Sequence, residues 1–181
     1  MRKLYLRDHS TDLHGTTVVR DEQGRSCYLL VGKWGMHHDV LSLYAINGDL
    51  LAEVKQLSLG ILPKFALYQQ RQRVGIVGKS FGFVRQVVYI RGLNWIIVGS
   101  PLGSRYRVFG AGKLVFALKP VQFSGSYCHE LRVTNKDDEP LAILVASVLD
   151  HWSRNGQIDS SKVQFRNRSL ADDLGMGFRV K

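Results

Sequence analysis

LAILVASVL, which runs from Leu141 to Leu149, is the most informative segment of this chain. All its residues except Ser147 are apolar, so it lacks the alternation of a half-buried strand. The preceding DDEP, residues 137–140, puts acids at the positive end of a helix dipole and proline in the first turn. These signals predict an α-helix over about 138–152, which must be buried on all sides because it is apolar on all sides. A fully buried strand is the alternative interpretation, since branched residues are frequent in the segment.

The chain ahead of this helix is predicted to form short strands. Apolar and polar residues alternate, and turn signals recur at intervals of roughly 8–12 residues, as is typical of a sandwich or barrel. No β-α-β pattern occurs, so a doubly wound sheet is not expected. The predicted strands cover residues 16–20, 26–31, 40–46, 50–57, 65–70, 74–79, 84–90, 95–98, 105–109, 113–119 and 127–134. Together with the helix, this pattern predicts a mainly β fold, a closed antiparallel β-barrel around a central apolar α-helix.

The clearest turn signal is Asn47-Gly48, between the predicted strands 40–46 and 50–57. Both central residues of a type I′ turn need positive φ angles, which asparagine and glycine tolerate. The sequence therefore predicts a type I′ hairpin here.

A faint internal duplication accompanies the strands. YLLVG, residues 28–32, resembles WIIVG, residues 95–99, and a hairpin with the same internal spacing follows each. A true repeat would give two similar half-sheets that close one barrel and leave no exposed strand edge. Chance similarity within a strand-rich chain is the alternative.

Length and composition predict one domain. The chain has 181 residues, of which 45% are hydrophobic, and this is enough to bury a core without covalent staples. We assign residues 1–152 to the barrel and 153–181, rich in basic and small polar residues, to a flexible basic tail. Cys27 and Cys128 are too few for a disulfide framework, so we expect buried reduced thiols, with a redox pair as the alternative.

No targeting or membrane-spanning segment is expected. Charged residues follow Leu6 too early for the apolar region of a signal peptide, which needs roughly 7–15 residues. The apolar run that ends at Leu149 is about half of the roughly 18 residues that span a bilayer. The protein is therefore expected in the cytoplasm.

The order of these elements resembles that of the LURP-one-related proteins. The resemblance rests on the acidic turn ending in Gly24, the strand 28–32, the hairpin over 43–55, a second such hairpin, and the apolar helix closing on Asp150. It covers roughly residues 4–152 and implies the fold of the tubby C-terminal domains and phospholipid scramblases, a closed barrel around an apolar helix. Tubby-like domains bind phosphoinositide headgroups through basic residues on the barrel exterior, and scramblase-like members associate with membranes. No headgroup motif can be transferred to this chain residue by residue.

Three short motifs were tested for catalytic or metal chemistry. Gly78-Lys79-Ser80-Phe81-Gly82 fits the G-x-S-x-G string of a nucleophile elbow, but a predicted strand follows where the elbow needs a helix. Neighbouring residues on an extended chain point to opposite faces, which argues against metal binding by His37-His38-Asp39 and against a nucleophile and base in Cys128-His129-Glu130. We therefore predict no catalytic residue, no metal site and no cofactor, and expect that the protein is not an enzyme.

The basic residues are the best functional candidates. The formal net charge is +10, which favours polyanions such as anionic lipid headgroups or nucleic acid. Arginines two residues apart on a strand share one face and can grip a phosphate together. The candidate anion-binding residues are Arg71, Arg73, Lys79, Arg85, Arg105 and Arg107. A solvated barrel wall, whose charge serves only solubility, is the competing interpretation.

The favoured hypothesis is a non-catalytic binding module whose basic exterior contacts anionic phospholipid headgroups or another polyanion. Such a protein would lie in the cytoplasm, peripheral to the membrane. The alternative is a nucleic-acid-binding or regulatory protein that uses the basic surface and the tail. Regularly interleaved aromatic residues, typical of single-strand binding, are absent from the sequence.

Overall fold

The computed structural model describes residues 1–7, 15–32, 40–58, 63–81, 86–123 and 125–153. Within these ranges, twelve strands form one closed barrel in which neighbours in sequence are antiparallel neighbours in space, and the first strand closes on the last. The predicted fold class is confirmed. The strands are β1 Arg2–Arg7, β2 Thr16–Asp21, β3 Ser26–Val31, β4 Val40–Ala45, β5 Leu50–Ser58, β6 Lys64–Gln69, β7 Gln72–Phe81, β8 Gln86–Arg91, β9 Trp95–Ser100, β10 Arg105–Gly110, β11 Lys113–Phe123 and β12 Ser126–Val133.

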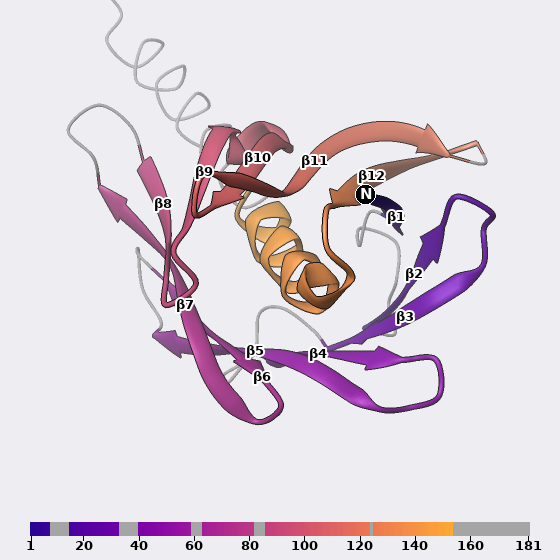
Figure 1. Ribbon diagram of the computed structural model, residues 1–181, viewed down its shortest axis with the longest axis horizontal. Coiled ribbons are helices and arrows are strands. Elements are labelled where there is room, and N and C mark those ends of the chain that lie inside the picture. Colours follow the sequence, from indigo (N-terminus) through magenta and orange to yellow (C-terminus); the bar gives the residue numbers. More distant parts are fainter. Residues whose placement is uncertain (8–14, 33–39, 59–62, 82–85, 124, 154–181) are drawn as a thin grey trace, which may run out of the picture.

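In the described part of the chain one α-helix, over residues 139–153, occupies the centre of the ring of strands (Figure 1). Every residue from Leu141 to Leu149 is buried, as an all-round apolar helix requires. The hydroxyl of Ser147 donates to the carbonyl of Ile143 at 2.9 Å, so the one polar side chain of this segment is satisfied within the helix. The prediction of a helix is confirmed and the alternative of a buried strand is wrong.

The ends of the helix differ slightly from the predicted bounds. A short 3-10 turn, η3 Lys136–Asp138, precedes it and is capped by Asn135. Ser153, assigned from the sequence to the tail, is the last described helical residue and is buried. The rest of the predicted tail, 154–181, lies outside the described residues.

The strand pattern missed β1. Leu4 and Leu6 point into the core, and six residue pairs join β1 to β12, from Arg2 opposite Val133 to Arg7 opposite Cys128. Only two pairs join β1 to β2. This strand closes the barrel, so its pairing depends on residues more than 120 positions away in sequence, and no local turn signal marks it.

The hairpin at Asn47-Gly48 is present, but the predicted type I′ turn is wrong. Among its residues only Gly48 has a positive φ, of 93°. Its amide donates to the carbonyl of Ala45, and the amide of Ala45 donates to the carbonyl of Asp49, which gives a longer loop with a glycine bulge. Two positive φ angles in succession occur instead at Gln70 and Arg71, in the two-residue turn between β6 and β7.

The two segments of the suspected duplication occupy equivalent positions. Strands β3 and β9 lie six strands apart in the twelve-strand barrel, half-way round it. Tyr28 and Trp95 both enter the core, and the hairpins β4 to β5 and β10 to β11 both carry an irregularity in register. This placement agrees with two similar half-sheets, while common ancestry stays a prediction.

The chain order gives the barrel two distinct ends. The turns after β2, β4, β6, β8 and β10, together with residue 1 and the start of the helix, all lie at one end, which we call the mouth. The core packs as aromatic pairs against the helix and across the wall, with Trp152 near Phe65 and Phe116 near both Trp95 and Tyr106.

Candidate functional site

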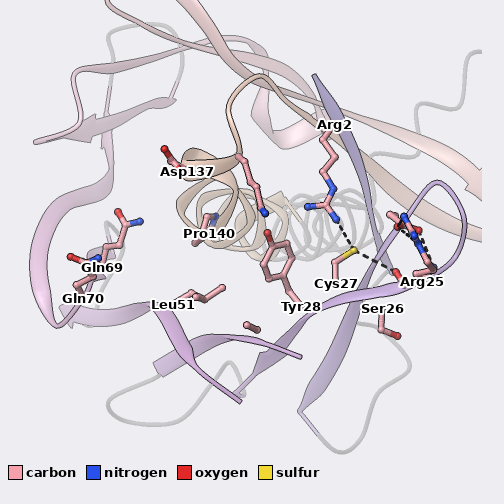
Figure 2. A pocket seen from close by; sticks show the side chains of 13 residues that line it. Arg2, Arg25, Ser26, Cys27, Tyr28, Leu51, Gln69, Gln70, Asp137 and Pro140 are labelled. Carbon is pink, nitrogen blue, oxygen red and sulfur yellow. Dashed lines mark hydrogen bonds and ion pairs between the residues drawn. The ribbon is translucent and has the colours of Figure 1, made fainter. Parts of the chain in front are cut away.

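Basic side chains line several hollows in the described part of the protein, of which two have volumes of about 600 Å³ or more. The first, which we call the mouth cup, has a volume of about 760 Å³ and opens at the mouth of the barrel beside the first turn of the helix. Figure 2 shows Arg2 reaching toward Cys27 and Tyr28 on one side of it, with Gln69 and Gln70 on the other.

A buried carboxylate organises the cup. Glu139, in the first turn of the helix, has no exposed surface. Its Oε2 accepts a hydrogen bond from the hydroxyl of Tyr28 at 2.5 Å and pairs with Nη1 of Arg2 at 3.0 Å. Burial works against the charge on Arg2, but Glu139, Cys27 and Tyr28 together more than offset it, so the pKa of Arg2 is raised. Burial and the bond to Glu139 raise the pKa of Tyr28 well above its ordinary value.

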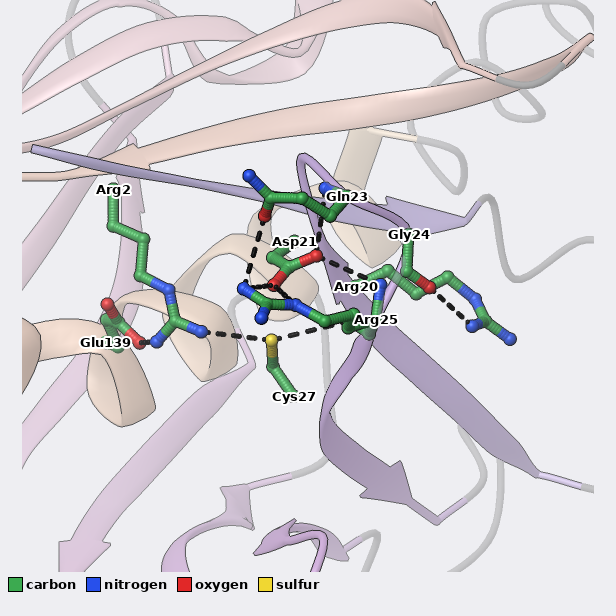
Figure 3. Close-up of polar contacts among 8 residues, drawn as sticks. All are labelled: Arg2, Arg20, Asp21, Gln23, Gly24, Arg25, Cys27 and Glu139. Atoms are coloured by element: carbon green, nitrogen blue, oxygen red, sulfur yellow. Dashed lines mark hydrogen bonds and ion pairs between the residues drawn. The ribbon is translucent and has the colours of Figure 1, made fainter.

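The second arginine of the cup is neutralised in the same way. Figure 3 shows the guanidinium of Arg25 against the carboxylate of Asp21, with Nε 2.8 Å from Oδ2. Oδ1 of Asp21 accepts from the amides of Gln23 and Arg25 at 3.0 and 2.9 Å. Burial alone would raise the pKa of Asp21, but the hydrogen bonds from the backbone and side chain of Arg25 prevail and lower it.

The thiol of Cys27 lies in this network but is not activated by it. Nη2 of Arg2 donates to Sγ at 3.0 Å, and the thiol is 3.5 Å from the carbonyl of Arg25, to which it donates. Burial raises the pKa of Cys27 despite the nearby guanidinium, so the thiol keeps its proton at neutral pH. The cup therefore contains two arginines held by carboxylates, a protonated thiol and Lys136, which forms no ion pair with a residue that the structure describes.

The second hollow, which we call the outer groove, lies on the outer wall of the barrel and has a volume of about 600 Å³. Its basic side chains come from three adjacent strands, β10, β11 and β12. They are Arg105, Arg107, Lys119 and Arg132.

Strand register explains why these side chains meet. Arg107 lies opposite Ala117, and Ala117 lies opposite Arg132, so an alanine stands between two arginines and leaves the wall hollow. Arg105 precedes Tyr106, which pairs with Leu118, and this sets Arg105 beside Lys119. Tyr106 and Val108 are buried while Arg105 and Arg107 are exposed, as the alternation of residues along β10 predicts.

Gly99 sets how closely β9 approaches the groove. Its φ is 119°, a conformation that side-chain-bearing residues rarely adopt. A Cβ at this position would come within 2.8 Å of the carbonyl oxygen of Arg105. The glycine therefore lets the backbones of β9 and β10 pack closely where Arg105 begins its strand.

The charges of the outer groove are only partly compensated. One buried carboxylate, Glu130, accepts from Nε of Arg132 at 2.6 Å and lies 3.5 Å from Nζ of Lys119. Burial would raise the pKa of Glu130, but the bonds from these two cations lower it. Arg105 and Arg107 form no ion pair with any residue that the structure describes.

The structure brings together only some of the residues singled out from sequence. Arg105 and Arg107 line the outer groove. Arg71 and Arg73 are exposed at the turn that opens β7, and β8 and β9 separate that strand from β10. Lys79 belongs to β7, and Arg85 lies outside the described residues.

Sequence reasoning missed Lys119 and Arg132 in the groove and Glu139 in the cup. The sequence placed Lys119 at the end of the predicted strand 113–119. That Lys119 lies beside Arg105 follows only from the register of β10 with β11. The run of acids at 137–139 suggested dipole stabilisation, whereas Glu139 is buried against residues 111 and 137 positions away.

The motifs rejected as catalytic fall on strands where the structure describes them. Ser80 lies in β7, and the antiparallel strand β8 follows, so the helix of a nucleophile elbow is absent here. In β12, Cys128 and Glu130 face outward, while His129 faces the helix, with Nδ1 3.8 Å from Oδ1 of Asp150. Both cysteines are free thiols, Cys128 buried and Cys27 half-buried. His37, His38 and Asp39 lie outside the described residues.

Within the described ranges, no group of three or more histidine, cysteine, aspartate or glutamate side chains could hold a metal ion. The same ranges contain no helix that combines the length and apolar character needed to cross a bilayer.

The chain shares its fold with a plant protein. An X-ray structure of a protein from Arabidopsis thaliana, AT5G01750, superposes with a TM-score of 0.54 and 15% identity, covering 83% of this chain and 90% of the other. The uncharacterized protein YxjI of Bacillus subtilis (strain 168) is 19% identical over 160 residues, which span 88% of this chain and 99% of YxjI. No family model matches the sequence. At these identities the likeness concerns the architecture, and the site must be argued from its own residues.

Proposed function

We propose that this protein is a non-catalytic binding module of the LURP-one-related, tubby-like type, and that its outer groove binds an anionic group such as the phosphate of a lipid headgroup. The observation that carries the proposal is the pair Arg105 and Arg107. The two side chains are exposed on one face of β10, leave the backbone about 7 Å apart along the strand, and lack a carboxylate partner in the described structure.

The surroundings of the pair support this proposal. Lys119 and Arg132 extend the basic surface and share a single carboxylate, so the groove keeps a net positive charge. The planar guanidinium of arginine presents several N–H donors that match a phosphate. Because the guanidinium groups of Arg105 and Arg107 have no carboxylate partner among the described residues, a ligand does not have to displace one when it binds. The strands that carry these side chains, β10, β11 and β12, are each paired on both sides within the barrel wall.

The test compares two double variants of the full chain, R105A/R107A and R71A/R73A. Both remove two exposed arginines spaced by two residues, so net charge falls equally. The probes are sodium tripolyphosphate and vesicles of phosphatidylcholine with phosphatidylserine, measured by calorimetry and by co-sedimentation. Each basic residue near an anionic surface contributes about 1 kcal/mol, so R105A/R107A should bind these vesicles roughly 30-fold more weakly.

The control variant R71A/R73A should lose less than about threefold, since exposed charges beyond a Debye length are screened at physiological salt. Equal losses in both variants would mean that binding follows net charge alone, and the proposal would be wrong. It would also be wrong if the unaltered protein bound neither probe at physiological salt.

A further inference from the structure

The outer groove has an apolar border on the side nearest the mouth. In one row across the wall, Ile96 lies opposite Phe109, and Phe109 lies opposite Leu114. Met1 lines the groove beside this row and is exposed. Ile96, the second residue of β9, keeps 67% of its surface exposed, a large fraction for an isoleucine in a strand.

The character of the wall then changes stepwise away from the mouth. The next row contains Val98, which is 54% exposed, opposite Arg107. The row after that contains Arg105 and Lys119. Successive rows are about 7 Å apart, so the face passes from apolar through mixed to basic within roughly 14 Å.

This order matches the order of groups at the surface of a bilayer. Hydrocarbon lies beneath the phosphates, and arginine can lay its apolar stem along the boundary while its guanidinium reaches the phosphate level. A nucleic acid offers phosphates but gives a contiguous apolar row little to contact, and protein surfaces that bind it are mainly polar and basic. A free soluble phosphate would leave the apolar row exposed to water.

We infer that the outer wall of β9, β10 and β11 docks on an anionic bilayer, with Ile96, Val98 and Met1 entering the headgroup boundary while Arg105 and Arg107 bind lipid phosphates. The inference rests on the proposed function and names the occupant of the same site. The inference also specifies how the barrel is oriented on the bilayer: the mouth end of this wall lies deepest in the headgroup region.

The test separates apolar insertion from anion binding. The variant I96T/V98T keeps β-branched side chains on the strand, and because both residues are exposed its stability should change little. It should bind vesicles of phosphatidylcholine with phosphatidylserine roughly tenfold more weakly, while its affinity for tripolyphosphate stays unchanged. The matched control I46T/L57T removes two apolar side chains of similar exposure, 51% and 48%, elsewhere on the barrel and should change neither affinity.

A second variant detects directly whether residue 96 inserts into the bilayer. The tryptophan added by Ile96→Trp should shift its emission to shorter wavelength on adding the mixed vesicles, and should not do so on adding tripolyphosphate or duplex DNA. If I96T/V98T binds vesicles as the unaltered protein does and I96W shows no shift, the inference is wrong, although tripolyphosphate binding lost in R105A/R107A would still support the proposed function. Tighter binding to duplex DNA than to vesicles, unaffected in I96T/V98T, would also overturn it.

Discussion

In the mouth cup every arginine meets a carboxylate, Arg2 on Glu139 and Arg25 on Asp21, whereas in the outer groove Arg105 and Arg107 meet none within the described structure. Both regions are hollow, both are basic in sequence, and the cup is the larger of the two. The difference lies in the burial of the acids, because the side chains of Glu139 and Asp21 are only 1% and 6% exposed. A buried carboxylate must be paired, and each of these two acids is paired with an arginine of the cup.

The comparison teaches that the larger hollow is not automatically the better binding site. In the cup, the side chain of Arg2 joins β1 to the start of the helix through Glu139, and the side chain of Arg25 bonds to Asp21 across the β2 to β3 turn. In the groove, the same residue type is left facing solvent. We therefore assign the cup to stability and the groove to binding, and the following experiments test that division.

The largest effect is expected from Glu139→Ala. The substitution leaves Nη1 of Arg2 and the hydroxyl of Tyr28 without their acceptor in a buried site. The free energy of unfolding, measured with urea, should fall by about 2–3 kcal/mol. Glu22→Ala breaks the exposed pair with Lys3 and should lower it by less than about 1 kcal/mol. Equal losses would show that burial of the cup network does not matter.

The next largest effect tests whether pairing the groove arginines with a carboxylate is enough to weaken vesicle binding. Ala117→Glu places a carboxylate between Arg107 and Arg132, which imitates the arrangement of the cup. Affinity for phosphatidylserine-containing vesicles should fall about tenfold, since one added acid neutralises one of the positive charges proposed to bind the headgroup. Ala117→Gln fills the same space without charge and should retain more of the affinity. If the two variants lose affinity equally, the hollow rather than the charge is what matters.

A smaller effect is expected when the free energy of unfolding is measured at low pH. The pKa of Asp21 is lowered in the folded protein, so this carboxylate stabilises the fold at pH values above the ordinary aspartate pKa of about 3.9. That stability is lost as the pH falls through the lowered folded value. Asp21→Asn should therefore lose less stability than the unaltered protein between pH 7 and about pH 3, as measured by urea unfolding. Arg25→Ala keeps the backbone bonds to Asp21 and should give an intermediate loss; identical curves for all three proteins would contradict the assignment.

The smallest effect is expected on the stability of R105A/R107A. Exposed side chains without ion-pair partners contribute little to folding, so its free energy of unfolding should stay within about 0.5 kcal/mol of the unaltered value. Thermal and urea unfolding both measure this. A loss as large as that of Glu139→Ala would assign the groove arginines to structure and remove the contrast between the two regions.

Much of the fold follows from local pattern. The run from Leu141 to Leu149 could not lie on a surface, and alternation along β10 correctly put Arg105 and Arg107 on the outside. Turn geometry was less predictable, since Gln70 and Arg71 both have positive φ angles although neither residue type usually prefers them. There the two-residue connection between paired strands imposes the conformation.

By itself, the sequence determined a barrel wall, an apolar helix to fill it and a surplus of basic residues, because hydrophobic period and charge are local properties of the chain. Only the tertiary structure decided which arginines are paired. The partners of Glu139 lie 111 and 137 residues away, and Arg132 reaches the groove only through the register of β11 with β12. Pairing across such separations is set by barrel closure, so a list of charged residues cannot distinguish the arginines that hold the fold from those left free to bind.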